Sequence, residues 1–129
     1  MTAYCKLPGL LDEIEQVAGR NAAIAIALGF GGLAKEFPVP DLLAKTPDRY
    51  ADHWLVTTVG TETALAIVKA IFPLGGRAEI PAARTALRRQ FVLDSAGHLS
   101  NSEIATALQL TDRAVRMIKA SLRKEKVMR

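Results

Sequence analysis

Two segments of the chain, 19–38 and 60–81, follow the same order of residue types. Each segment runs from a glycine through an alanine-rich stretch to a Gly-Gly pair, a short extended stretch and a proline. The matching residues are Gly19, Ala23, Ala25, Ile26, Gly31, Gly32, Phe37 and Pro38 against Gly60, Ala64, Ala66, Ile67, Gly75, Gly76, Ile80 and Pro81. A repeated unit that cannot bury its own apolar face usually packs against its copy. The two repeats are therefore expected to pair within one chain, between two chains, or both.

Each repeat is expected to contain two helices followed by a short strand. In the first repeat, about 8–40, apolar residues spaced three and four apart predict a helix over 10–18. Asn21 is a suitable cap for a second helix over 22–30. Residues 33–38 then predict a strand, and the prolines around its end place it at the edge of a sheet.

The second repeat, about 46–81, carries the same signals. A proline at the favoured first position of a helix predicts a helix over 47–59. Thr61 is a suitable cap for a following helix over 62–72. Residues 77–80 predict the second strand, which a proline ends.

The helix expected over 22–30 is apolar on all sides, and such a helix must be buried on every side. In so small a chain, full burial indicates a partner subunit. We therefore predict that two copies of the chain pair through the apolar helices of the repeats. The predicted dimer interface consists of Ile24, Ile26, Phe30, Leu65, Ile67 and Ile71.

Residues 101–120 have the spacing of a helix-turn-helix, a motif that places its second helix in the major groove of DNA. The positions expected to pack between the two helices are Ile104, Ala105, Leu108, Val115 and Ile118. Ser100 and Glu103 can form a capping box at the start of the first helix, and Thr111 can cap the second. In the turn, Gln109 stands where such motifs usually have glycine, and a positive φ there costs about 1 kcal/mol relative to glycine.

The charge of the chain is concentrated around this motif. The net charge is +4, yet residues 82–129 carry 10 Lys and Arg against 4 Asp and Glu, a net +6, whereas residues 1–81 carry a net −2. Such a basic half is the electrostatic footprint of a nucleic-acid-binding module. A helix from 82 to about 95 is expected to complete a three-helix domain, with its arginines turned outward. The alternative of a merely solvated basic tail accounts for the charges at 124–129 but not for these arginines.

The side-chain chemistry of this domain predicts its contacts with double-stranded DNA. Arginine reads guanine edges, and an apolar side chain can contact the methyl group of thymine. The residues expected at bases are Thr111, Asp112, Arg113, Arg116 and Met117. The residues expected at phosphates are Arg84, Arg88, Arg89, Lys119, Arg123 and Lys124.

With these residues in place, the chain resembles the Mor transcription activator family of Mu-like bacteriophages. The likeness lies in the segment GGRAEIP at 75–81, the basic helix after it and the helix-turn-helix up to Ala120, and it extends over about 8–124. The first repeat, from Gly19 to Pro38, looks like the same family unit.

The resemblance implies a homodimeric phage or prophage activator. It implies a helical dimerisation domain with a short intermolecular sheet, binding to an inverted-repeat promoter site, and recruitment of the host RNA polymerase. It also implies that a strand approaches the minor groove between the half-sites, a role that falls by position on Gly75, Gly76 and Arg77. Glu79 departs from the family, which often has an aromatic residue there.

Other classes of function lack support in the sequence. The two histidines, His53 and His98, lie in no metal-binding motif, and neither Gly-Gly pair has the spacing of a phosphate loop. We therefore expect no enzyme, no cofactor and no metal. A single cysteine, Cys5, excludes an internal disulfide and fits a reducing compartment. The longest apolar stretch is too short to cross a bilayer, so we expect a cytoplasmic protein with no membrane partner, and the resemblance implies that its host is a bacterium.

The sequence thus predicts a mainly α fold with short β-strands. Residues 1–81 are expected to form a dimerisation domain from the two repeats, and residues 82–129 a helix-turn-helix domain. The predicted function is that of a sequence-specific transcription activator that binds DNA as a homodimer. Two alternatives stay open, which are a repressor of the same architecture and a helical module whose helix-turn-helix binds protein.

Overall fold

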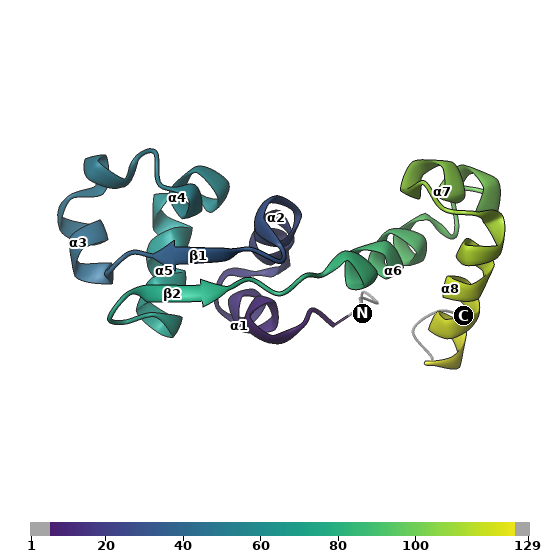
Figure 1. Ribbon diagram of the computed structural model, residues 1–129, viewed down its shortest axis with the longest axis horizontal. Coiled ribbons are helices and arrows are strands. Elements are labelled where there is room, and N and C mark those ends of the chain that lie inside the picture. Colours follow the sequence, from purple (N-terminus) through teal and green to yellow (C-terminus); the bar gives the residue numbers. More distant parts are fainter. Residues whose placement is uncertain (1–5, 126–129) are drawn as a thin grey trace. The chain divides into compact units, whose positions relative to one another are not determined.

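The computed structural model describes residues 6–125, and 68% of these residues are helical (Figure 1). This part of the chain contains eight α-helices and one two-stranded antiparallel sheet, so the mainly α prediction is confirmed. It divides into two compact units, one formed by Leu7–Ala83 and the other by Lys6 together with residues 84–125. Cys5 lies outside the described residues. Among the described helices, none has both the length and the apolar character needed to cross a membrane.

The first unit contains the two repeats. Its elements are α1 (Gly9–Ala18), α2 (Arg20–Phe30), β1 (Ala34–Phe37), α3 (Pro40–Lys45), a 3-10 turn (Pro47–Tyr50), α4 (Trp54–Val59), α5 (Thr61–Ile71) and β2 (Gly76–Glu79). Helix α1 packs against α2 and α5, and α4 packs against the same two helices. Strands β1 and β2 pair antiparallel, so the strands of the two repeats meet within one chain (Figure 1).

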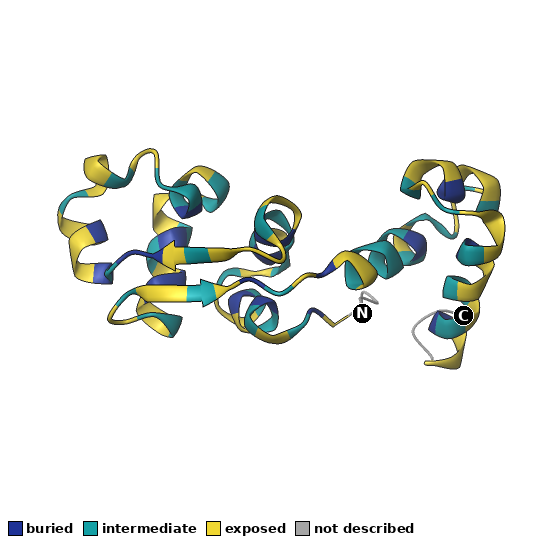
Figure 2. Cartoon of the chain, in the orientation of Figure 1, coloured by how far each residue is buried: buried dark blue, intermediate teal, exposed yellow. Residues whose placement is uncertain are grey.

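The core of this unit lies between its helices and on one side of the sheet (Figure 2). Both repeats contribute fully buried aliphatic side chains, including Leu11, Ile14, Ile26, Leu43, Leu55, Ile67, Val68 and Ile80. An aromatic cluster covers one part of the sheet, where Phe37 stacks on Phe72 and meets Trp54 edge to face. The indole Nε1 of Trp54 donates a hydrogen bond to the backbone oxygen of Glu36 at 2.6 Å, which ties α4 to β1.

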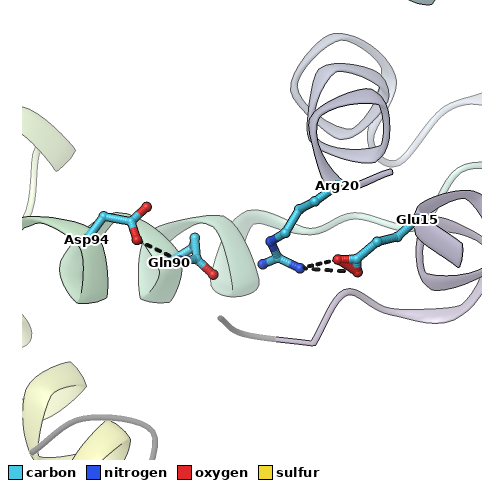
Figure 3. A network of polar contacts seen from close by, with 4 residues as sticks. All are labelled: Glu15, Arg20, Gln90 and Asp94. Carbon is cyan, nitrogen blue, oxygen red and sulfur yellow. Dashed lines mark hydrogen bonds and ion pairs between the residues drawn. The ribbon is translucent and has the colours of Figure 1, made fainter. Parts of the chain in front are cut away.

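The corner between α1 and α2 is tight because Gly19 adopts φ +93°, a conformation that only glycine takes without strain. Across this corner, a guanidinium nitrogen of Arg20 donates to both carboxylate oxygens of Glu15, at 2.7 and 3.3 Å (Figure 3). Gly60 adopts nearly the same conformation, φ +88°, between α4 and α5. Gly19 and Gly60 each occupy the N-cap position of the following helix. The predicted caps were Asn21 and Thr61, so these two predictions are wrong.

The single helix predicted over 47–59 is wrong. The structure has the 3-10 turn at Pro47–Tyr50 and then α4, because His53 takes an extended backbone conformation and caps α4. Its Nδ1 accepts a hydrogen bond from the backbone N–H of Leu55 at 3.2 Å. Helix α3 was not predicted. Within the single chain the helix over 22–30 is not buried on every side, because Leu28 is 72% exposed.

The second unit consists of α6 (Arg84–Ser95), α7 (Asn101–Leu108) and α8 (Asp112–Lys124). On α6, Gln90 donates a hydrogen bond to Asp94 at 2.8 Å (Figure 3). All three helices contribute to one small core, formed by the buried residues Val92, Ile104, Ala105, Val115 and Leu122. Phe91, Leu93, Leu99, Leu108 and Ile118 pack around it. The five positions predicted to lie between the helices of the helix-turn-helix therefore all belong to this core or pack against it.

The turn between α7 and α8 places Gln109 in the left-handed region, with φ 58° and ψ 43°. This is the only non-glycine residue with a positive φ among residues 6–125. Because a side chain is strained there and glycine is not, we expect Gln109→Gly to raise the free energy of unfolding of this unit by about 1 kcal/mol. Urea denaturation followed by circular dichroism measures the change. Gln109→Ala is the matched control, since it keeps a Cβ and gains nothing, and a Gln109→Gly variant no more stable than this control would contradict the assignment.

Candidate nucleic-acid interface

Helix α7 begins at the predicted capping box, which the structure confirms. The Ser100 hydroxyl accepts from the backbone N–H of Glu103 at 3.1 Å, and the Glu103 carboxylate accepts from the backbone N–H of Ser100 at 3.0 Å. A hydrogen bond from the backbone N–H of Ser100 to the Glu103 carboxylate, followed by one from the Ser100 side chain, lowers the pKa of Glu103 below its ordinary value. The box fixes where α7 starts.

Helix α8 begins at Thr111, whose hydroxyl accepts a hydrogen bond from the backbone N–H of Ala114 at 3.1 Å. Thr111 therefore caps α8 as predicted, and it is exposed at the start of the helix. Asp112 lies in the first turn, where a carboxylate suits the positive end of the helix dipole.

The two sides of α8 differ sharply. Val115 and Leu122 are fully buried in the core of the unit. The opposite side presents exposed side chains spaced three and four residues apart, which form one stripe along the helix. This stripe, here called the α8 stripe, consists of Arg113, Arg116, Met117, Ala120, Arg123 and Lys124. It contains four cations and no anion, and Met117 within it is 63% exposed.

Two of the six residues predicted at phosphates are held by their own unit. Arg89 on α6 donates to the Ser121 hydroxyl at 2.8 Å and forms an ion pair with Glu125, and its side chain is only 18% exposed. Lys119 on α8 donates to the side-chain oxygen of Asn101 at the start of α7. These contacts join helices that lie far apart in the sequence, so no local pattern indicates them. Arg84 is exposed and Arg88 is partly exposed.

A groove of about 380 Å³ runs beside the α8 stripe, between α6 and α8. Its lining residues are Thr85, Arg88, Arg89, Leu110, Ala114, Met117, Ile118 and Ser121. Met117 belongs both to this groove and to the stripe. No local sequence pattern indicates the groove, because its two walls come from different helices.

The strand predicted to approach the minor groove lies in the other unit. Arg77 is exposed, but its guanidinium lies 3.9 Å from the Glu36 carboxylate of the paired strand, and Glu79 is exposed on the same strand. A Cβ at Gly75 would lie 3.0 Å from a methyl group of Val39 and 3.1 Å from the oxygen of Phe37. The turn into β2 therefore requires Gly75 for packing, and this surface offers DNA no excess of positive charge.

The residues predicted at a dimer interface divide into two groups. Ile26 and Ile67 are fully buried inside the first unit, so the chain itself covers them. The other four are partly buried, and they are Ile24, Phe30, Leu65 and Ile71. Within the described chain, Ile26 and Ile67 thus offer no surface to a second chain.

His53, one of the two histidines considered as possible metal ligands, has a structural role. His53 caps α4, and burial, followed by the charge of Lys35, lowers the pKa of its imidazole below the ordinary value. Among residues 6–125, no group of three or more His, Cys, Asp or Glu could hold a metal ion.

Comparison with protein-family models, with curated proteins and with solved structures finds no match for this chain.

Proposed function

We propose that this protein is a sequence-specific DNA-binding transcription regulator that reads the major groove with α8. The observation that carries the proposal is the α8 stripe, in which four exposed cations lie on the side of the helix opposite to its buried face. An α-helix fits the major groove of B-DNA, and arginine is the side chain that most often reads a base edge there. A helix-turn-helix that binds protein would instead present an apolar stripe.

The position of each side chain suggests its role. Arg113 and Arg116 lie one turn apart near the start of α8, where recognition helices contact bases, and Met117 beside them is suited to a thymine methyl group. Thr111 and Asp112 would contact the DNA at the helix start. Arg123 and Lys124 in the last turn, together with Arg84 and Arg88 on α6, would contact phosphates. Arg89 and Lys119 act instead by holding the three helices in place.

If Arg116 reads a base, removing its side chain should lower the affinity for the preferred duplex. Arg116→Ala should weaken binding to the preferred duplex by about 5- to 150-fold, equivalent to about 1–3 kcal/mol, and should relax the preference at one base pair. The reason is that a bidentate contact to guanine is lost while the phosphate contacts remain. Fluorescence anisotropy with the preferred duplex and with its single-base variants measures both effects.

Lys124→Ala is the matched control, since it removes a cation of the same stripe that is assigned to phosphate. It should weaken all duplexes by about the same factor. If Arg116→Ala also lowers specific and non-specific binding equally, Arg116 contacts only phosphate and the assignment of α8 as the reading helix fails.

The resemblance to Mor activators favours activation, through recruitment of a host RNA polymerase. A repressor would need the same contacts to DNA, so the direction of regulation is an outcome to measure. A reporter gene behind a promoter that carries the preferred site provides the measurement. We expect expression to rise when the protein is present, and a fall would assign it as a repressor.

A further inference from the structure

The two repeats have the same structure as well as the same sequence pattern. Gly19 and Gly60 share both backbone angles, with φ +93° and +88° and ψ 163° and 161°. Five residues buried in the first repeat match residues buried in the second. The matched pairs are Ile14 with Leu55, Ala23 with Ala64, Ile26 with Ile67, Ala27 with Val68, and Phe37 with Ile80.

The contacts between the repeats are also exchanged symmetrically. Helix α1 of the first repeat packs on α5 of the second, and α4 of the second packs on α2 of the first. In the sheet, Glu36 lies opposite Arg77 and Ala34 lies opposite Glu79. A shift of 43 residues, which is the spacing of Pro38 and Pro81, turns each of these pairs into the other.

This register places an approximate two-fold axis at Lys35 and Ala78, which lie opposite each other. A true two-fold axis makes a contact between residues i and j recur as a contact between j and i, as in a symmetric homodimer. Here one chain supplies both halves. Each repeat covers the apolar face of the other, so Ile26 and Ile67 are both fully buried without a second chain.

The symmetry ends where the two strands end. After β2, the chain continues through Pro81 into α6 and the helix-turn-helix. After β1, it continues through Pro38 into the short α3 and the 3-10 turn, and then enters the second repeat. The symmetric unit is therefore followed by one helix-turn-helix, where a symmetric dimer of two chains would carry two.

We infer that the unit Leu7–Ala83 is a single-chain counterpart of a two-fold dimer, and that the protein is a monomer which takes a non-palindromic DNA site as its ligand. The part of this inference that concerns DNA rests on the proposed function. It departs from the homodimer and the inverted repeat that the resemblance implies. One reading helix per chain matches one half-site, whereas an inverted repeat requires two helices about one helical turn of DNA apart.

The mass of the full chain in solution tests the monomer without reference to DNA. Sedimentation velocity from about 1 to about 100 µM should give 13.9 kDa at every concentration. The melting midpoint of Trp54 fluorescence should be independent of protein concentration, because only a folded dimer is stabilised by mass action. A species of about twice the monomer mass, or a midpoint that rises with concentration, overturns the inference.

The stoichiometry on DNA tests the second half. With a duplex taken from a random-pool selection, we expect one chain per duplex and a selected motif without inverted symmetry. Two chains on one inverted repeat overturn the inference even if the free protein is monomeric. If the protein is a monomer but binds no duplex, the proposed function and the assigned DNA site are overturned. Its mass would still support the inference that the Leu7–Ala83 unit is a single-chain counterpart of a dimer.

Discussion

Raising the salt concentration from 50 to 200 mM should lower the affinity of this protein for duplex DNA by roughly 100-fold, for about four neutralised phosphates. The four cations assigned to phosphate are Arg84, Arg88, Arg123 and Lys124, which the structure leaves exposed or partly exposed. Each phosphate contact releases condensed counterions, and the release becomes less favourable as bulk salt rises. Anisotropy titrations of one labelled duplex at several salt concentrations measure the slope.

The slope also distinguishes one chain from two. A dimer that doubles the phosphate contacts should lose roughly 10⁴-fold over the same range. Lys124→Ala should reduce the slope by about one unit. Lys45→Ala is the matched control, because it removes an exposed cation from the acidic half of the chain and should leave the slope unchanged. Binding that does not change with salt would contradict a phosphate-based interface.

The second large effect is expected from Ile26→Asp, which should strongly destabilise the Leu7–Ala83 unit. Ile26 is fully buried, so the substitution removes apolar packing and places an unpaired carboxylate in the core. The expected loss is about 4 kcal/mol or more. A unit of this size has a total stability of roughly 4–12 kcal/mol at typical values per residue, so the substitution removes from about one third to all of it.

Trp54 is the only tryptophan in the sequence and lies in this unit, so its fluorescence in a urea titration reports on this unit. Leu28→Asp is the matched control on the same helix, because Leu28 is 72% exposed and its substitution should change stability little. Ile67→Asp should reproduce Ile26→Asp, since the two isoleucines are equivalent under the approximate two-fold symmetry. If Ile26→Asp kept the wild-type unfolding curve and only changed the oligomeric state, Ile26 would face a second chain.

Features determined by neighbouring residues were predictable from the sequence. The capping box at Ser100 and the cap at Thr111 depend on side chains within three residues, and both were found where expected. The left-handed Gln109 was expected from its place in the turn. The periodicity of apolar residues also identified the buried faces of α7 and α8. Each of these signals lies within a few neighbouring residues, so it can be recognised in a single sequence.

Two kinds of feature were not predictable from the sequence. One kind depends on competition between two possible helix starts, and the other depends on contacts between residues far apart in the sequence. Pro47 does begin a helical turn, but His53 offers a better start six residues later, and the chain divides the segment between them. Arg89 and Lys119 have the charge of phosphate ligands, yet partners on other helices hold them. The sequence alone does not decide how the two repeats pair, because the same apolar faces could be covered by the other repeat or by a second chain.

Selection of bound duplexes from a random DNA pool is the most direct test of the claim that α8 reads DNA sequence. With the full chain at low salt, we predict enrichment of one motif of a few base pairs without inverted symmetry. With Arg116→Ala, the same selection should lose the preference at one position of that motif. A pool that stays random after repeated rounds with the wild-type protein would contradict sequence-specific binding by this helix.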